Sequence, residues 1–187
     1  VFLSQGILET AILVLIALVL PAVSPAWRNR RYVQTLLVTL AIATPLVLAW
    51  PVALKSRSPA LFELWLQRDW ALLWRNPDRD LKFYAHILPW HAWPVWAVFA
   101  WQLWVMRREQ YTTAAAALPL TGFVITFVML SLLSGARDLY ALTLLPAAAL
   151  FATPATSQLR RGAANAWLWF SAVFVIVFLI AGWFYWS

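Results

Sequence analysis

Six long apolar stretches, separated by short polar connectors, fill almost the whole chain. They cover residues 7–23, 34–54, 84–105, 114–133, 139–156 and 166–186, and none has Lys or Arg between its ends. A helix needs roughly 20 consecutive apolar residues to cross a bilayer. Lipid cannot hydrogen-bond to the backbone, and the stretches are too long and too uniformly apolar for barrel strands. Each stretch is therefore predicted to be a helix.

The pattern predicts an all-α, multi-pass transmembrane helical bundle with about six spans. A water-soluble helical protein with a large core is the alternative, and uncharged stretches of this length argue against it. We treat residues 1–187 as a single membrane region. Since the chain does not begin with Met and has no signal-peptide pattern, we expect it to be a fragment of a larger membrane domain.

The longest connector, residues 55–83, predicts a short helix in the membrane interface. Ser58 can cap this helix, and Pro59 suits its first position. Polar residues then alternate with Trp and Leu, as in a helix that lies along a bilayer surface; a plain surface helix joining two spans is the simpler interpretation. The segment 76–80, Asn-Pro-Asp-Arg-Asp, predicts a turn that ends the helix.

Charge indicates how the chain is oriented. The formal net charge is +7, and only 11% of residues are charged. If the connectors alternate between the two sides of the membrane, each side receives seven basic residues. One of these two sets lies in short connectors that contain few acidic residues: Arg28, Arg30, Arg31, Arg107, Arg108, Arg160 and Arg161. The positive-inside rule assigns these clusters to the cytoplasm, so both termini and the 55–83 loop are predicted outside. Basic residues that flank spans contact anionic head groups, so the charge does not indicate nucleic-acid binding.

Two pairs of side chains in the outer segments resemble metal ligands, and neither makes a convincing site. Asp78 and Asp80 lie in a solvated turn and would need further oxygen ligands to hold Ca²⁺ or Mg²⁺. His86 and His91 are five residues apart, so they project about 140° from each other on a helix. We predict no metal site from these residues, and the absence of Cys says nothing about redox function.

The short connector before residue 139 places charge at the edge of the bilayer. Arg137 and Tyr140 are three residues apart and share a helical face, whereas Asp138 points elsewhere. A guanidinium at this depth needs an anionic partner, and a lipid phosphate matches its fork of donors. The alternative is that Arg137 only reaches ordinary head groups or pairs with an acid elsewhere in the bundle.

The run RDLYALTLLP, from Arg137 to Pro146, resembles the Lys-Arg-Glu-x-Tyr-Leu-Leu-Pro-x-x-Pro segment of bacterial aminoarabinose-transferase-like glycosyltransferases. These enzymes are grouped with the protein O-mannosyltransferases in the GT-C class. Three further segments match in order: LSQGILE from Leu3, LAWPVAL from Leu48 and YAHILPWHAWP from Tyr84. The chain departs from the pattern at Ala136 and Gln5, where the family has Lys, and at Thr143, where it has Pro.

The resemblance implies an integral-membrane glycosyltransferase in the bacterial inner membrane. Such an enzyme moves a sugar from a polyprenyl-phosphate donor to a periplasmic-side glycolipid or protein acceptor. Its catalytic residues are expected in the N-terminal region that precedes this chain, so the fragment alone is expected to be inactive. The residues implied on the donor side are Arg137, Tyr140 and Asp138, with Arg68, Asp69 and Gln5 as weaker candidates. No cofactor is evident in the sequence, and the resemblance leaves room for a divalent cation in the full-length enzyme.

Two other classes of function remain open from the sequence. A non-catalytic multi-pass membrane protein, such as a permease subunit or an assembly scaffold, would also carry these spans and would need no donor-binding cations. A secondary transporter is disfavoured, because the spans contain no acidic residue beyond Glu9 and no matched pair of broken helices.

Overall fold

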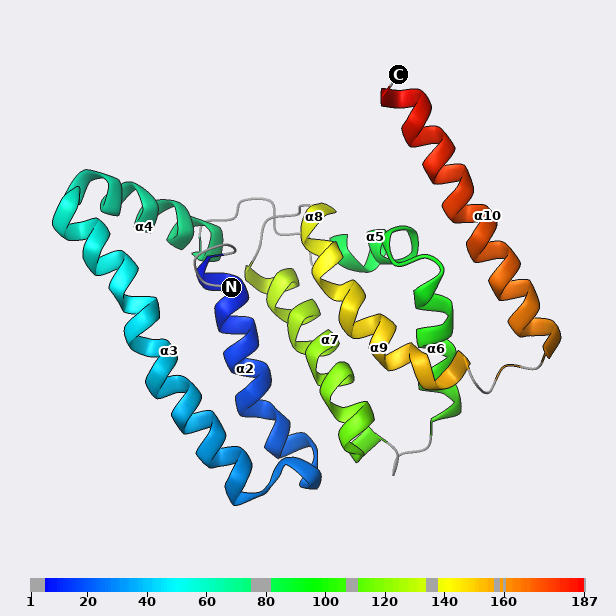
Figure 1. Ribbon diagram of the computed structural model, residues 1–187, viewed down its shortest axis with the longest axis horizontal. Helices are drawn as coiled ribbons and strands as arrows, with labels where there is room; N and C mark the ends of the chain where they lie inside the picture. The colour runs from blue at the N-terminus through cyan, green and yellow to red at the C-terminus, as the bar shows by residue number, and fades with distance from the viewer. Residues whose placement is uncertain are drawn as a thin grey trace.

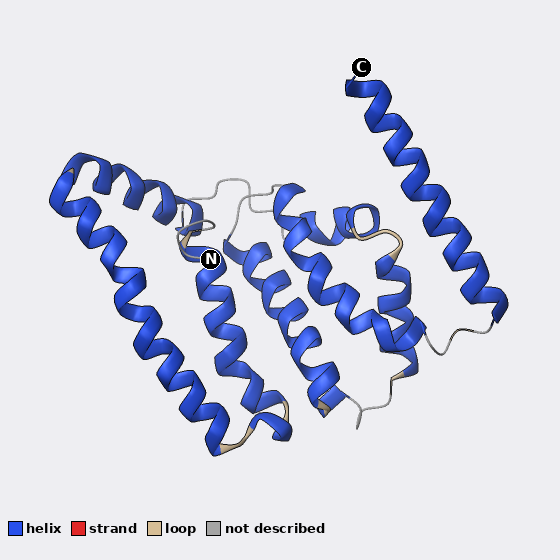
Figure 2. Ribbon diagram, in the orientation of Figure 1, coloured by secondary structure: helices blue, strands red, loops and turns tan. Residues whose placement is uncertain are grey.

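The computed structural model describes residues 6–74, 82–106, 111–133, 138–156, 159 and 161–186. This part of the chain is almost entirely helical and contains no strand (Figures 1 and 2). The α-helices, labelled as in Figure 1, are α2 (Ile7–Val23), α3 (Arg30–Arg57), α4 (Pro59–Trp74), α5 (Phe83–His91), α6 (Val95–Val105), α7 (Ala114–Leu133), α8 (Asp138–Ala141), α9 (Leu145–Thr156) and α10 (Arg161–Trp186). Two 3₁₀ turns, η1 (Pro25–Trp27) and η3 (Leu142–Leu144), complete the described elements.

Three of these helices, α3, α7 and α10, are long and apolar enough to cross a membrane. They run roughly parallel to one another and to α2 in space (Figure 1). The other apolar helices are shorter, and α2 has 17 residues. The all-helical class is therefore confirmed and the helices indicate a membrane protein, while six crossings remains a prediction.

The expected single span over residues 84–105 is wrong in one respect, because the structure divides it into α5 and α6. The turn between them contains Trp93 and Pro94. Proline has no N–H to donate, and its ring disfavours helical backbone at the preceding residue. The prediction counted apolar residues and gave too little weight to this proline.

The turn from α2 to α3 shows how backbone groups freed by a proline are satisfied. Pro21 cannot donate to the carbonyl of Ala17, and the hydroxyl of Tyr32 donates to that oxygen instead, at 2.7 Å. The guanidinium of Arg28 donates to the carbonyls of Pro21 and Ala22, at 2.6 and 2.9 Å, where α2 ends. These bonds stabilise the hairpin, because a bare carbonyl is costly where water is scarce.

Replacing Tyr32 by Phe should test the contribution of its hydroxyl. The variant leaves the carbonyl of Ala17 without its side-chain donor, so we expect a loss of about 0.5–2 kcal/mol in the free energy of unfolding. Unfolding in mixed micelles measures this difference. Tyr185→Phe is the matched control, because Tyr185 is 93% exposed at the end of α10. Equal stability of the two variants would show that the Tyr32 bond contributes nothing.

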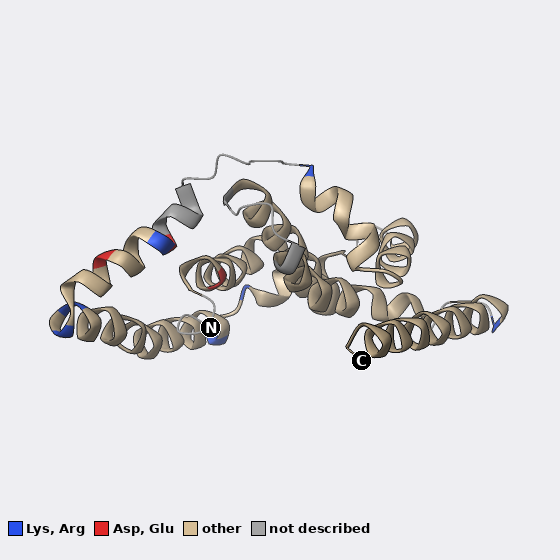
Figure 3. Ribbon diagram, turned by 90° about the horizontal axis from the view of Figure 1, so that it is seen from above, with Lys and Arg blue, Asp and Glu red and all other residues tan. Residues whose placement is uncertain are grey.

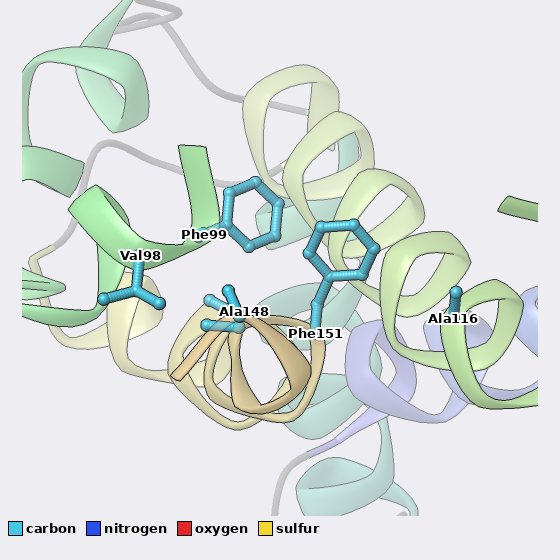
Figure 4. Packing of buried hydrophobic residues seen from close by; sticks show 7 residues of the cluster. Val98, Phe99, Ala116, Ala148 and Phe151 are labelled. Atoms are coloured by element: carbon cyan, nitrogen blue, oxygen red, sulfur yellow. The ribbon is translucent and has the colours of Figure 1, made fainter. Parts of the chain in front are cut away.

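The most extensive contact between two helices is that of α6 with α9, and α7 packs against α9 beside it (Figure 4). Small residues on one face of α9, namely Ala148, Ala152 and Ala155, allow its backbone to approach α6 closely. Phe151 fills the space beside them, with its ring centroid 5.0 Å from that of Phe99. These side chains form the first buried cluster of the fold.

By contrast, α3 and α10 have no buried residue. Leu46 on α3 is 68% exposed and Leu179 on α10 is 69% exposed. Apolar surface of this extent is stable only in lipid or against other protein. These two helices therefore form the apolar flanks of the bundle.

Candidate functional site at the α4 end of the bundle

One end of the bundle gathers segments that are far apart in the sequence. From the end of α3, α4 turns back towards the first turn of α2, and α5 and α8 lie near the same end (Figure 1). We call this region the α4 end of the bundle. The described charged residues lie on α4 and near helix ends, as Figure 3 shows.

At this end, Asp69 of α4 packs against Gly6, the residue that precedes α2. The Oδ2 atom of Asp69 lies 3.1 Å from the position that a Cβ atom would take at Gly6. Gly6 also has a φ of +86°, a backbone conformation that other residues rarely adopt. Glycine is thus required here both by its conformation and by the close approach of the carboxylate.

A second acidic side chain, Glu9, lies in the first turn of α2. Neither Oε1 of Glu9 nor Oδ2 of Asp69 is exposed to solvent, and neither has a hydrogen-bond partner within the described part of the chain. The Oγ atom of Ser131, near the end of α7, has the same property. Buried oxygens without partners are costly, so each of these atoms would be stabilised by a hydrogen-bonding partner.

A buried cluster lies beneath these polar groups and joins α2, α5, α7, α8 and η3. Its largest fully buried side chain is that of Tyr84, which is 1% exposed. Tyr140 of α8 is half-buried and packs against the same cluster. The other buried members are Leu8, Ile12, Leu130, Ala141 and Leu144.

The structure separates the candidates that the sequence put forward. Tyr140 and Asp69 both lie at the α4 end, whereas Arg68, next to Asp69 in α4, is exposed. Asp138 begins α8. Two other candidates, Arg137 and Gln5, fall outside the described residues, as do the side chain of Asp138 and the pair Asp78 and Asp80, which the sequence analysis rejected as a metal site.

Each of the two histidines is close to a backbone carbonyl of its own helix. Nδ1 of His86 lies 3.1 Å from the carbonyl oxygen of Lys82, and Nδ1 of His91 lies 3.3 Å from that of Ile87. Both are i to i−4 contacts within the α5 region.

Among the residues that the structure describes, no group of three or more His, Cys, Asp or Glu side chains could hold a metal ion. Two carboxylates, Glu9 and Asp69, lie at the α4 end, and further oxygen ligands would be needed to complete the shell of a divalent cation there.

Sequence reasoning overlooked three residues of this site. None was named as a site residue: Glu9 was considered as a transporter acid and, with Gly6, as part of the LSQGILE segment, and Tyr84 as the first residue of a span and of the YAHILPWHAWP segment. An acidic residue in an otherwise apolar helix was the available signal for Glu9. No local signal pointed to the burial of Tyr84, because it depends on α5 packing against α7 and α8.

Comparison with known proteins adds no assignment. No family model matches the chain, and neither a curated protein nor a solved structure matches it significantly.

Proposed function

We propose that this chain is the C-terminal membrane part of a glycosyltransferase that moves a sugar from a polyprenyl-phosphate donor to an acceptor at the α4 end. The acceptor would be a glycolipid or a protein on the periplasmic side of a bacterial inner membrane. The site residues put forward are Glu9, Asp69 and Tyr140, together with Arg137.

One observation carries the proposal. The segments that resemble the transferase family are separated by up to about 130 residues, yet three of them contribute to one buried cluster: Leu8 from the first, Tyr84 from the third, and Ala141 and Leu144 from the fourth. Apolar side chains of any helix bundle pack into such a core, but this cluster also brings three of the four segments to the α4 end, where their polar residues could act on one ligand.

The chemistry of the site fits two parts of such a donor. Carboxylates accept hydrogen bonds from sugar hydroxyls, which suits Glu9 and Asp69. The donor's phosphate instead needs hydrogen-bond donors and cations, because carboxylates repel it. The hydroxyl of Tyr140 can donate to a phosphate oxygen, and the resemblance assigns the same partner to the guanidinium of Arg137. Positioned donors of this kind also stabilise the phosphate as it leaves the anomeric carbon.

The proposal is tested by the binding of a polyprenyl phosphate to the full-length protein. We expect this lipid to raise the thermal unfolding midpoint of the wild type. Tyr140→Phe removes a hydrogen bond to a charged group, so the dissociation constant should rise about tenfold. The hydroxyl of Thr143 donates to the backbone carbonyl of Tyr140 at 2.7 Å. Tyr140→Phe keeps this hydrogen bond, because the bond does not involve the ring hydroxyl.

Tyr185→Phe provides the matched control, since Tyr185 lies far along α10 and is exposed. It should bind the lipid as the wild type does. If polyprenyl phosphate does not stabilise the wild type more than a phospholipid of equal charge, the transferase proposal is wrong. A non-catalytic scaffold or permease subunit would then be the better interpretation.

A further inference from the structure

The backbone at the start of α2 has a conformation that is nearly restricted to glycine. Gly6 has φ +86° and ψ −165°, and among the residues that the structure describes it is the one with a positive φ. Such conformations persist where the surrounding structure requires them, and they gather at active sites and ligand-binding positions. The conformation of Gly6 therefore points to a role beyond the start of a helix.

Asp69 takes up the space that a side chain at Gly6 would occupy. Its Oδ2, Cγ and Oδ1 atoms lie 3.1, 3.8 and 3.9 Å from the position of a Cβ atom at Gly6. The whole carboxylate group thus lies against bare backbone. At the other described glycines, no atom comes closer than 3.9 Å to the corresponding position: Gly122, Gly162 and Gly182. The close approach is therefore particular to Gly6 within the described part of the chain.

Asp69 lies on the face of α4 that packs onto the bundle. Phe62, Trp65 and Asp69 are half-buried and follow one another at steps of three and four residues, so they share one helical face. Gln67 and Arg68, which precede Asp69, are exposed. The position of the Asp69 carboxylate therefore depends on how closely α4 approaches α2, which it contacts.

The end of α2 that Asp69 approaches is the positive end of the helix dipole. The first N–H groups of a helix have no partner within the helix, and a nearby carboxylate is favoured there. Gly6 is the N-cap residue of α2 and has no side chain that could accept from these groups. Electrostatics thus draws the Asp69 carboxylate towards Gly6, and the missing Cβ atom allows it to come within contact distance.

We infer that Gly6 is a positioning residue that acts on sugar transfer through Asp69. Its bare backbone sets the depth at which the carboxylate rests against the start of α2. This inference rests on the proposed function, in which the Asp69 carboxylate accepts a hydrogen bond from a sugar hydroxyl. It adds that transfer depends on the position of this carboxylate as well as on its charge.

The test is a double-mutant cycle on the rate of sugar transfer by the full-length protein. Gly6→Ala places a methyl group 3.1 Å from Oδ2 of Asp69, so the carboxylate has to move. A displacement of about 1 Å can cost as much as about 100-fold in rate, and we expect a loss of about tenfold. In an Asp69→Ala background there is no carboxylate to displace, so Gly6→Ala should change the rate by less than about twofold. The strain that alanine meets at this φ is present in both backgrounds and cancels from the comparison.

A binding measurement distinguishes positioning from a general loss of structure. Polyprenyl phosphate without a sugar offers no sugar hydroxyl to Asp69, so it should bind Gly6→Ala with the affinity of the wild type. Weaker binding would show that the whole α4 end is distorted and would overturn the inference. Gly182→Ala is the matched control for the rate, because Gly182 lies on α10 with open space around it. It should retain the rate of the wild type.

The outcomes separate this inference from the proposed function. If the wild type transfers sugar but Asp69→Ala keeps its rate, or if Gly6→Ala has the same effect in both backgrounds, the inference is wrong and the proposed function stands. If the wild type transfers no sugar, the proposed function is wrong and the inference with it.

Asp69→Glu decides the matter should Gly6→Ala fail to fold. Glutamate keeps the charge but is one methylene longer, so its carboxylate cannot stay at the same place beside Gly6. A rate lowered about tenfold supports the inference, because position then matters in addition to charge. A rate equal to that of the wild type overturns it.

Discussion

Asp69→Asn in the full-length protein is expected to lower the rate of the proposed sugar transfer about 10- to 100-fold. The substitution keeps the size of the side chain and its position against Gly6, but it removes the negative charge. A hydrogen bond from a sugar hydroxyl to a carboxylate contributes about 1.5–3 kcal/mol, and its loss corresponds to this change in rate. The measurement is the initial rate of transfer from a polyprenyl-phosphate-linked sugar, with the protein reconstituted in liposomes.

Glu63→Gln is the control for this experiment. Glu63 lies on the same helix, α4, and is exposed away from the site. It should retain the rate of the wild type. If Asp69→Asn also retains that rate with its fold intact, the carboxylate beside Gly6 has no part in the reaction, and the α4 end loses its main polar candidate.

Phe151→Ala is expected to be the most destabilising substitution in the described core. Phe151 is 1% exposed and lies between α6, α7 and α9, in contact with the ring of Phe99. In a bilayer the lost free energy comes from packing and from the cavity left behind, since lipid is as apolar as the core. We expect a loss of about 2–4 kcal/mol, measured by unfolding in mixed micelles.

Replacing an exposed Phe by Ala should have little effect on the free energy of unfolding. Phe184 of α10 is 74% exposed, so Phe184→Ala is expected to change the free energy of unfolding by less than about 0.5 kcal/mol. A Phe151→Ala variant as stable as Phe184→Ala would mean that α6 and α9 do not pack as described. It would also weaken the site, because α9 continues the segment that carries Tyr140.

The elements of this fold were largely predictable from local pattern. The expected segments 7–23 and 114–133 coincide with α2 and α7, and Pro59 begins α4 as expected. These features depend on the length of an apolar run or on the conformation of a single proline, which neighbouring residues determine. The break between α5 and α6 was missed, although Pro94 was the local signal for it.

The site was only partly predictable. Tyr140 and Asp69 were named from a resemblance and do lie at the α4 end, but Asp69 and Gly6 are 63 residues apart and nothing local indicated their contact. Such a contact is set by the way α4 folds back over the start of α2. Helix packing of this kind depends on side chains from several elements at once.

The sequence by itself determined that the chain is helical and apolar enough for a membrane, because lipid leaves the backbone no other partners. It also determined where the long helices α3, α7 and α10 begin and end to within a few residues. Only the tertiary structure decided that Asp69 packs against Gly6, that Tyr84 is enclosed and that a pocket opens beside α10. Those features depend on the distances between helices, which small residues such as Ala148 and Ala152 allow to be short and which no single segment encodes.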